Sequence, residues 1–112
     1  MKFFKKEMNV YIVVFITTKN LSQAKKISRQ LIKEKLIACA NIVQGVESVF
    51  WWQNKVDQSK EVLLIIKTKK DLFSTLVKKV KALHSYAVPE IIALPIVEGN
   101  PDYLKWLEES VK

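Results

Sequence analysis

One stretch near the start of the chain decides the fold: Val10-Tyr11-Ile12-Val13-Val14-Phe15-Ile16. It is apolar at odd and even positions alike, which is typical of a strand buried on both faces. The polar residues 17–20 end it, and Asn20 or Ser22 can cap a helix. Apolar residues then recur at helical spacing, with Lys and Arg on the opposite face, so we predict a helix over residues 21–36.

The middle of the chain predicts a β-hairpin. An extended segment begins at Cys39 and runs to Trp52, and Gly45 within it favours a bulge or bend. Residues 53–60 are polar enough to form the tip of the hairpin, and residues 61–68 carry the apolar returning strand.

The rest of the chain repeats the alternation of helix and strand. A second helix is predicted to open at Asp71 and a last strand to cover residues 91–97, where Pro95 favours a sheet edge or a bulge. Asn100-Pro101 is a typical start for a short closing helix. The predicted order β-α-β-β-α-β is that of a ferredoxin-like α+β sandwich, here with an added C-terminal helix.

Length and composition limit the class of protein. The 112 residues suit one domain, which we assign to residues 10–112, with residues 1–9 as an N-terminal extension. A hydrophobic content of 49% argues against intrinsic disorder. One Cys and one His exclude an intrachain disulfide and a zinc cage built from several such residues of one chain. Two glycines are too few for a Gly-rich dinucleotide-binding loop.

The N-terminus resembles a signal peptide, because basic residues precede an apolar run. That run has only seven apolar residues, and Glu7 interrupts the basic part. No stretch approaches the ~18 apolar residues of a membrane span. We therefore expect a strand at residues 10–16 and a protein that is cytoplasmic and not bound to membranes.

Both faces of the sheet are predicted to be apolar, although the helices can cover only one of them. Both crossover helices of such a fold lie on the same side of the sheet. Residues 10–16, 62–66 and 91–94 are nevertheless apolar at alternate positions on both sides. The closing helix is too short to cover a four-stranded face, and monomers rarely expose an apolar patch of that size. We therefore expect another copy of the chain to cover it.

Several ordered motifs resemble the CutA divalent-cation tolerance family. The matching segments are Leu-Ile-Ala-Cys-Ala-Asn-Ile at 36–42, Ser-Val-Phe-Trp-Trp at 48–52, Glu61 with Lys67-Thr68, the segment 84–96 from His84 to Ile96, and Tyr103-Leu104-Lys105-Trp106. The resemblance implies a homotrimer of ferredoxin-like protomers, similar in architecture to the PII signalling proteins. It also implies a role in tolerance of copper and other divalent cations, without an established reaction, and we expect a protein that is not an enzyme.

The chain departs from that family's pattern at four positions. Ser85 and Ala87 stand where the family has Pro and Glu, and Gln53 and Asn54 stand where it has Glu and Gly. Two carboxylates that could bind a cation are therefore missing.

Cys39 and His84 are the candidate metal ligands, because copper and zinc favour thiolate and imidazole donors. Glu90 could add an oxygen donor, and a threefold assembly would contain three copies of Cys39 instead of one. We do not expect such an ion to be required for folding. The alternatives are a buried Cys39 that acts as a small hydrophobe and a protonated His84 at the end of the second helix. A covalent Cys–His mechanism is not expected, since no third residue supports it.

A second hypothesis is a PII-like sensor of a small anionic ligand. Its clefts between subunits would be lined by Lys67 and Tyr86 with Glu90. The alternative for Tyr86 is a buried hydrogen bond to Glu90. Trp51 and Trp52 point to opposite faces of their strand, so at most one can enter the protomer core, and we assign them to the trimer interface.

The formal charge is +8, and the excess lies on the two predicted helices: residues 19–35 carry +5 and residues 69–83 carry +4. The RNA recognition motif shares the order β-α-β-β-α-β, but residues 61–68 lack its stacking aromatics. We therefore expect solvated basic faces, and nucleic acid is the remote alternative.

Overall fold

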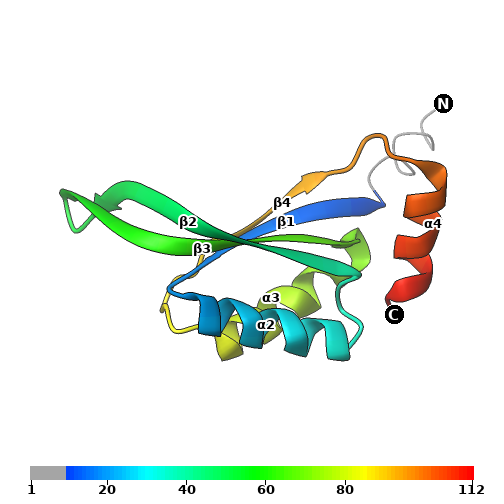
Figure 1. The fold of residues 1–112 in the computed structure, drawn as a ribbon, viewed down its shortest axis with the longest axis horizontal. Coiled ribbons are helices and arrows are strands. Elements are labelled where there is room, and N and C mark those ends of the chain that lie inside the picture. Colours follow the sequence, from blue (N-terminus) through cyan, green and yellow to red (C-terminus); the bar gives the residue numbers. More distant parts are fainter. Residues whose placement is uncertain (1–9) are drawn as a thin grey trace.

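The computed structural model describes residues 10–112; the predicted N-terminal extension, residues 1–9, lies outside them. The described chain forms a sheet, helices and one short 3-10 turn (Figure 1). In chain order the elements are β1 (Tyr11–Thr18), α2 (Leu21–Lys33), β2 (Cys39–Trp52), β3 (Lys55–Lys69), the 3-10 turn η1 (Lys70–Leu72), α3 (Phe73–Leu83), β4 (Ile91–Pro95) and α4 (Pro101–Ser110).

The four strands form one antiparallel sheet in the order β2-β3-β1-β4. Helices α2 and α3 lie side by side beneath one face of it (Figure 1). The ferredoxin-like α+β fold with an added C-terminal helix is therefore confirmed. The prediction that Pro95 lies at a sheet edge is also confirmed, since β4 is an outer strand.

The core lies between this face and the two helices. Alternate residues of β1 and β3 point to the helices and are buried beneath their apolar stripes. The largest fully buried side chains of this core include Ile16, Ile27, Leu31, Leu64, Ile66 and Leu76.

The other side of the sheet, which we call the open face, carries the intervening strand residues. Its apolar members are Val13, Phe15, Val43, Leu63, Ile65, Ile92 and Leu94. Helix α4 covers only one end of it, where Leu107 packs with Ala38, Val111, Tyr11 and Leu72. Ile92 and Leu94 are more than half exposed, so the open face is apolar and largely uncovered in the described chain, as the sequence predicts.

The β2–β3 hairpin projects beyond the helices (Figure 1). Its tip is the pair Gln53-Asn54, whose φ angles of 50° and 65° are those of a tight two-residue turn. The predicted tip over residues 53–60 is therefore wrong, because residues 55–60 already belong to β3. They are mostly polar, as expected of a strand segment that is exposed to solvent. The bulge at Gly45 is confirmed by its φ of 79° and by the register shift between Val43 and Val46.

Helix boundaries also differ slightly from the prediction. Helix α2 ends at Lys33 instead of residue 36, and Lys35 has a φ of 57°. Strand β4 ends at Pro95 instead of residue 97. Both predicted caps are confirmed: the side chain of Asn20 accepts from the backbone N–H of Gln23, and that of Asn100 accepts from Asp102.

Candidate functional site

The predicted site residues fall into two clusters at opposite ends of the sheet. Cys39 lies beside Lys67, which is paired with Val13 on β1. His84 contacts the carbonyl oxygen of Thr17 at the other end of β1. Val13 and Thr17 are four residues apart, or roughly 13 Å at the usual rise of a strand. One chain therefore does not bring Cys39 and His84 together.

The first group, the Cys39 cluster, consists of Cys39, Asn41, Lys67 and Tyr103. The Cys39 Sγ lies 3.8 Å from Asn41 Oδ1, and the Lys67 ammonium donates a hydrogen bond to the same oxygen. All three strand residues point to the open face. Cys39 is free and only half-buried, so it is not the fully buried hydrophobe of the alternative prediction.

Helix α4 adds aromatic side chains to this cluster. The rings of Tyr103 and Trp106 pack in a tilted arrangement, with a centroid distance of 5.3 Å and an interplanar angle of 43°. Burial, followed by the charge and hydrogen bond of Cys39, raises the pKa of the Tyr103 phenol. The sequence analysis did not assign Asn41 or Tyr103 to a site. Asn41 could have been found, because it lies two residues after Cys39 on the same strand face.

The second group, the His84 cluster, consists of His84, Tyr86, Glu61 and Thr17. The Nε2 atom of His84 lies 2.7 Å from the Thr17 carbonyl oxygen, and its Nδ1 accepts from the backbone N–H of Tyr86 at 3.0 Å. A carbonyl only accepts and an amide N–H only donates, so the ring is the neutral Nε2–H tautomer. The predicted protonated imidazole is therefore wrong, and both ring nitrogens are already engaged.

Tyr86 reaches across the end of β1 to β3. Its phenol donates to Glu61 Oε2 at 2.8 Å, and its ring lies 4.7 Å from that of His84. Burial first, and then the hydrogen bond and charge of Glu61, raise the pKa of Tyr86 to about 12. The predicted bond to Glu90 is wrong: Glu90 is exposed immediately before β4.

Lys67 and Tyr86 do not share a cleft within one chain. Lys67 belongs to the Cys39 cluster, whereas Tyr86 is tied to Glu61. Glu61 and Lys67 are six residues apart on β3, which corresponds to roughly 20 Å. Any cleft that contains both side chains would need more than one chain.

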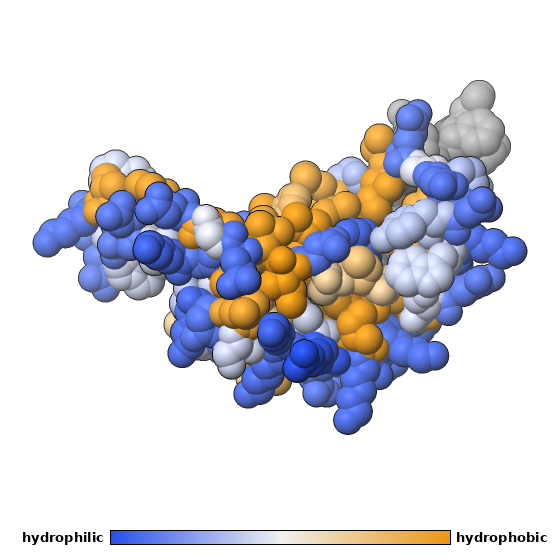
Figure 2. All heavy atoms as spheres, in the orientation of Figure 1, coloured by the Kyte–Doolittle hydropathy of each residue, from blue (hydrophilic) through white to orange (hydrophobic). Residues whose placement is uncertain are grey.

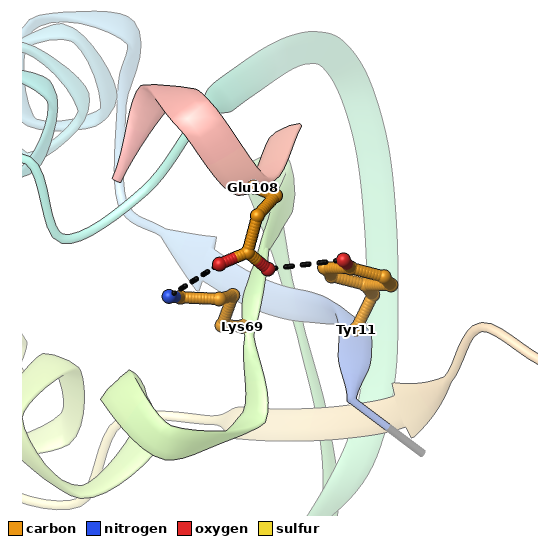
Figure 3. A network of polar contacts seen from close by, with 3 residues as sticks. All are labelled: Tyr11, Lys69 and Glu108. Atoms are coloured by element: carbon orange, nitrogen blue, oxygen red, sulfur yellow. Dashed lines mark hydrogen bonds and ion pairs between the residues drawn. The ribbon is translucent and has the colours of Figure 1, made fainter. Parts of the chain in front are cut away.

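A third polar network fixes α4 to the sheet (Figure 3). The Tyr11 phenol donates to Glu108 Oε1 at 3.0 Å, and the Lys69 ammonium lies 3.1 Å from Glu108 Oε2. The hydrogen bond from Lys69, followed by that from Tyr11, lowers the pKa of the Glu108 carboxyl. This network joins residues 97 positions apart, and the sequence analysis did not anticipate it.

Trp51 and Trp52 lie on the projecting hairpin and not in the core. Trp51 is 75% exposed and Trp52 is 55% exposed, and they point to opposite faces of β2. Phe50, Val49 and Val56 are also exposed there. Figure 2 shows apolar side chains gathered near the end of this hairpin. The hairpin therefore offers an apolar surface that no other part of residues 10–112 covers.

The donor side chains of residues 10–112 do not make a complete metal site. Within residues 10–112, no three His, Cys, Asp or Glu side chains converge as they would around an ion. The same residues contain no helix of the length and apolar character that crossing a membrane requires.

Comparisons with known proteins agree with the fold. The family model described as CutA1 divalent ion tolerance protein matches residues 12–110. The chloroplastic protein CutA 1 of Oryza sativa subsp. japonica is 52% identical over 101 residues, or 90% of this chain and 57% of the rice protein. The divalent-cation tolerance protein CutA of Thermus thermophilus is 49% identical over 98 residues, or 88% of this chain and 95% of that protein. The chain thus spans little more than half of the rice relative.

Solved structures show the same architecture. The divalent cation tolerance protein Cut A1 from Thermus thermophilus aligns with a TM-score of 0.90 and 47% identity, over 91% of this chain and 99% of that one. The CutA1 structure from Oryza sativa also gives 0.90, with 50% identity over 94% of this chain and 97% of that one.

Proposed function

Since the chain belongs to the CutA1 divalent ion tolerance protein family, we propose that it acts in divalent-cation tolerance as a non-enzymatic, cytoplasmic homotrimer that binds a metal ion such as copper. The observation that carries this proposal is the position of Cys39. The only thiol of the chain lies half-exposed on the open face, where a neighbouring chain would meet it.

The open face supports assembly. Its apolar side chains are uncovered except where α4 packs, and Trp51 and Trp52 extend on the hairpin. A monomer with both surfaces in water would expose more apolar area than soluble monomers usually tolerate. Copies arranged around a closed symmetry axis would bury both, because each chain could offer its hairpin to the next chain's sheet.

The metal-binding role rests on the donor chemistry of Cys39. A thiolate is a preferred ligand of copper and zinc, and the amide oxygen of Asn41 lies beside it. One chain offers too few donors, so a complete site needs donors from neighbouring chains. His84 and Glu90 are the further candidates, and His84 would have to give up its bond to Thr17. We expect folding not to require the ion, and the satisfied buried side-chain N and O atoms of residues 10–112 support this expectation.

Titration calorimetry with Cu²⁺ and with Zn²⁺ tests the ligands. Cys39→Ser should weaken binding at least tenfold, and Ser48→Ala, on the same strand, should leave it unchanged. His84→Asn should weaken binding only if a neighbouring chain supplies that imidazole. Unchanged affinity in Cys39→Ser would reject the thiol as a ligand.

Sedimentation equilibrium tests the assembly. A homotrimer has a mass of about 39 kDa, three times the 13.0 kDa of one chain. The double variant Ile92→Lys/Leu94→Lys should dissociate it, because it places two charges on the open face. Thr75→Lys, on the outside of α3, should not. A 13.0 kDa monomer at micromolar concentration would contradict the proposed assembly.

A second candidate is a sensor of a small anionic ligand. The observation in its favour is the Lys67 ammonium, a cation on the open face that donates a hydrogen bond to Asn41. Tyr86 and Glu90 of a neighbouring chain would complete the cleft. Thermal-shift measurements with inorganic phosphate and nucleotides should show stabilisation that is lost in Lys67→Gln. Stabilisation by metal ions alone would reject this candidate.

A further inference from the structure

The helix layer has a basic outer surface. On both helices apolar residues point to the sheet, and exposed cations occupy the opposite side. We call this surface the outer helix face, and its cations are Lys26, Arg29 and Lys33 of α2 and Lys78 and Lys81 of α3. Figure 2 shows hydrophilic side chains along the helices, on the side away from the sheet. The outer helix face and the open face lie on opposite sides of the chain, so an assembly through the open face would leave the outer helix face in solvent.

No carboxylate neutralises these five cations in the part of the chain that the structure describes. Neither helix contains an acidic residue. The ion pairs of the described chain are Lys69–Glu108 and Lys79–Glu34. Glu34 follows α2 and lies 2.9 Å from the Lys79 ammonium, so it links the two helices. Its carboxylate is therefore already paired with a cation outside the outer helix face.

The spacing of the cations weakens the helices that carry them. Lys26, Arg29 and Lys33 follow one another at intervals of three and four residues, so they lie side by side on α2. Lys78 and Lys81 are three residues apart on α3. Like charges at these spacings repel each other and destabilise a helix. A bound anion would remove this repulsion, so the outer helix face favours an anionic partner.

The outer helix face offers charge but few other means of recognition. Helix α2 contains no aromatic residue, and Phe73, the one aromatic residue of α3, packs partly buried against the core. Nucleic-acid bases would therefore find no ring on which to stack. In the two described helices, Ile32 is the one large apolar side chain that is exposed, and it lies beside Ala40 of β2. This is too little apolar surface to enter a lipid bilayer.

The type of cation also limits the partner. Four of the five cations are lysines, and Arg29 is the exception. A lysine ammonium is a compact point charge with rotatable donors, whereas the arginine fork selects planar partners that accept two hydrogen bonds. The partner therefore needs closely spaced oxyanions on a flexible chain, and it needs neither bases nor apolar groups. A linear chain of condensed phosphates has this chemistry, because every repeat unit carries a charge.

We propose that the outer helix face binds linear inorganic polyphosphate, whose chain crosses α2 and α3. The lysine and arginine side chains donate hydrogen bonds to the phosphate oxygens. Lys26 and Lys33 are seven residues apart, or about 10 Å along the helix axis, so a chain of several phosphates is needed to reach them all. Neutralised phosphates release counterions, so the affinity falls as the salt concentration rises. The proposal requires neither a metal site nor an assembly.

Fluorescence anisotropy with the full chain and end-labelled, long-chain polyphosphate tests the proposal. The polymer should bind saturably at low salt, and its affinity should fall steeply as salt is added. Inorganic phosphate at the same total phosphate concentration should not displace it, because a single anion cannot reach both helices. Absence of saturable binding at low salt, or displacement by inorganic phosphate at that concentration, would overturn the proposal.

Charge-neutralising variants locate the binding surface. Arg29→Gln/Lys33→Gln should lower the affinity at least about tenfold. Lys105→Gln/Lys112→Gln removes the same charge from exposed positions at the other end of the chain, and it should lower the affinity less than about threefold. Glutamine is a good helix former, so the α2 variant keeps its helix and loses only the cations. Equal losses in the two variants would show an effect of net charge alone and would overturn the proposal.

The second helix is tested in the same way. Lys78→Gln/Lys81→Gln should also lower the affinity at least about tenfold, because the bound chain crosses both helices. Unchanged affinity in this variant would contradict that path. Polyphosphate should raise the thermal midpoint of the wild type and should raise that of the α3 variant less. An unchanged midpoint of the wild type at saturating polymer would also contradict the proposal.

Two other polyanions decide the class of partner. At equal concentrations of charge, polyglutamate and a DNA duplex should displace labelled polyphosphate less well than the unlabelled polymer does. Stronger displacement by the duplex would assign the outer helix face to nucleic acid, and stronger displacement by polyglutamate would assign it to an acidic protein. Either result would overturn the assignment to polyphosphate.

Discussion

The Tyr86 phenol donates a 2.8 Å hydrogen bond to Glu61, 25 residues earlier in the chain. Glu61 pairs with Val46, the first residue after the bulge, so this bond joins the loop that follows α3 to the point where the hairpin leaves the sheet. His84 holds the same loop through the Thr17 carbonyl. The orientation of the hairpin and that of the loop are therefore coupled.

Loss of the phenol should destabilise this junction. Tyr86→Phe leaves the largely buried Glu61 carboxylate without its donor, and we expect a loss of about 1–3 kcal/mol in the free energy of unfolding. Urea denaturation at a fixed protein concentration measures it. In a double-mutant cycle with Glu61→Gln, the two effects should be non-additive by at least about 0.5 kcal/mol. Additive effects would show that the bond contributes no coupling energy.

Tyr86 should ionise late in an alkaline titration. Its pKa is raised to about 12 in the folded protein, from an ordinary value of 10.0 in the unfolded chain. The folded state therefore holds this proton more tightly, and the resulting stabilisation is complete below pH 10 and is lost as the pH rises through 12. The difference in absorbance at about 295 nm between the wild type and Tyr86→Phe reports this tyrosine alone. A difference that titrates at the ordinary value would contradict the effect of Glu61 and of burial.

Replacement of Gly45 should lower the stability of the protein because of its backbone conformation alone. Its φ is 79°, and a Cβ added there would meet no atom within 4 Å. Gly45→Ala should thus cost about 1–2 kcal/mol through left-handed strain without any clash. Gly45→Asn is the matched control and should cost less, because asparagine tolerates this region better. Thermal unfolding of the two variants gives the comparison, and equal losses would point to a cause other than φ.

Leu107 should be the apolar anchor of α4. It is fully buried against Ala38 and Val111, and Leu107→Ala should lower the free energy of unfolding by about 2–5 kcal/mol. The neighbouring exposed variant Lys105→Ala should change it by less than about 0.5 kcal/mol. Amide exchange of residues 101–110 should accelerate in Leu107→Ala alone. Protection as in the wild type would show that α4 is held mainly by polar contacts.

The stabilisation that the Glu108 network provides should decrease at low pH and at high salt concentration. The hydrogen bond from Lys69, followed by that from Tyr11, lowers the pKa of Glu108. The folded protein therefore favours the carboxylate, and this stabilisation is present above the ordinary carboxyl range and is lost as the pH falls through the lowered pKa. NMR titration of the Glu108 carboxyl should give a higher pKa in Lys69→Gln, and a smaller difference at 1 M salt. An unchanged pKa in Lys69→Gln would contradict the assignment of its cause.

The elements and the open face were predictable because they depend on local patterns. Residues 10–16 are apolar at every position, which predicts burial on both faces. Ile92 and Leu94 on the open face are exposed, so residues 10–112 of one chain leave that face largely uncovered. Asn20, Asn100 and Gly45 act through neighbours a few residues away. The hairpin tip was misplaced because polar residues 55–60 form an exposed strand as readily as a loop.

For the candidate site, the sequence predicted which types of residue are available but not which of them lie together. The sequence by itself determined that one thiol and one imidazole are available. It also determined that the sheet has a second apolar face, which the two crossover helices do not cover. The tertiary structure alone decided that Cys39 and His84 lie at opposite ends of the sheet, and that Glu61, not Glu90, accepts from Tyr86. The reason is physical: hydrophobic periodicity specifies which face a side chain points to, whereas the meeting of residues far apart depends on strand register and helix docking, which only the folded chain sets.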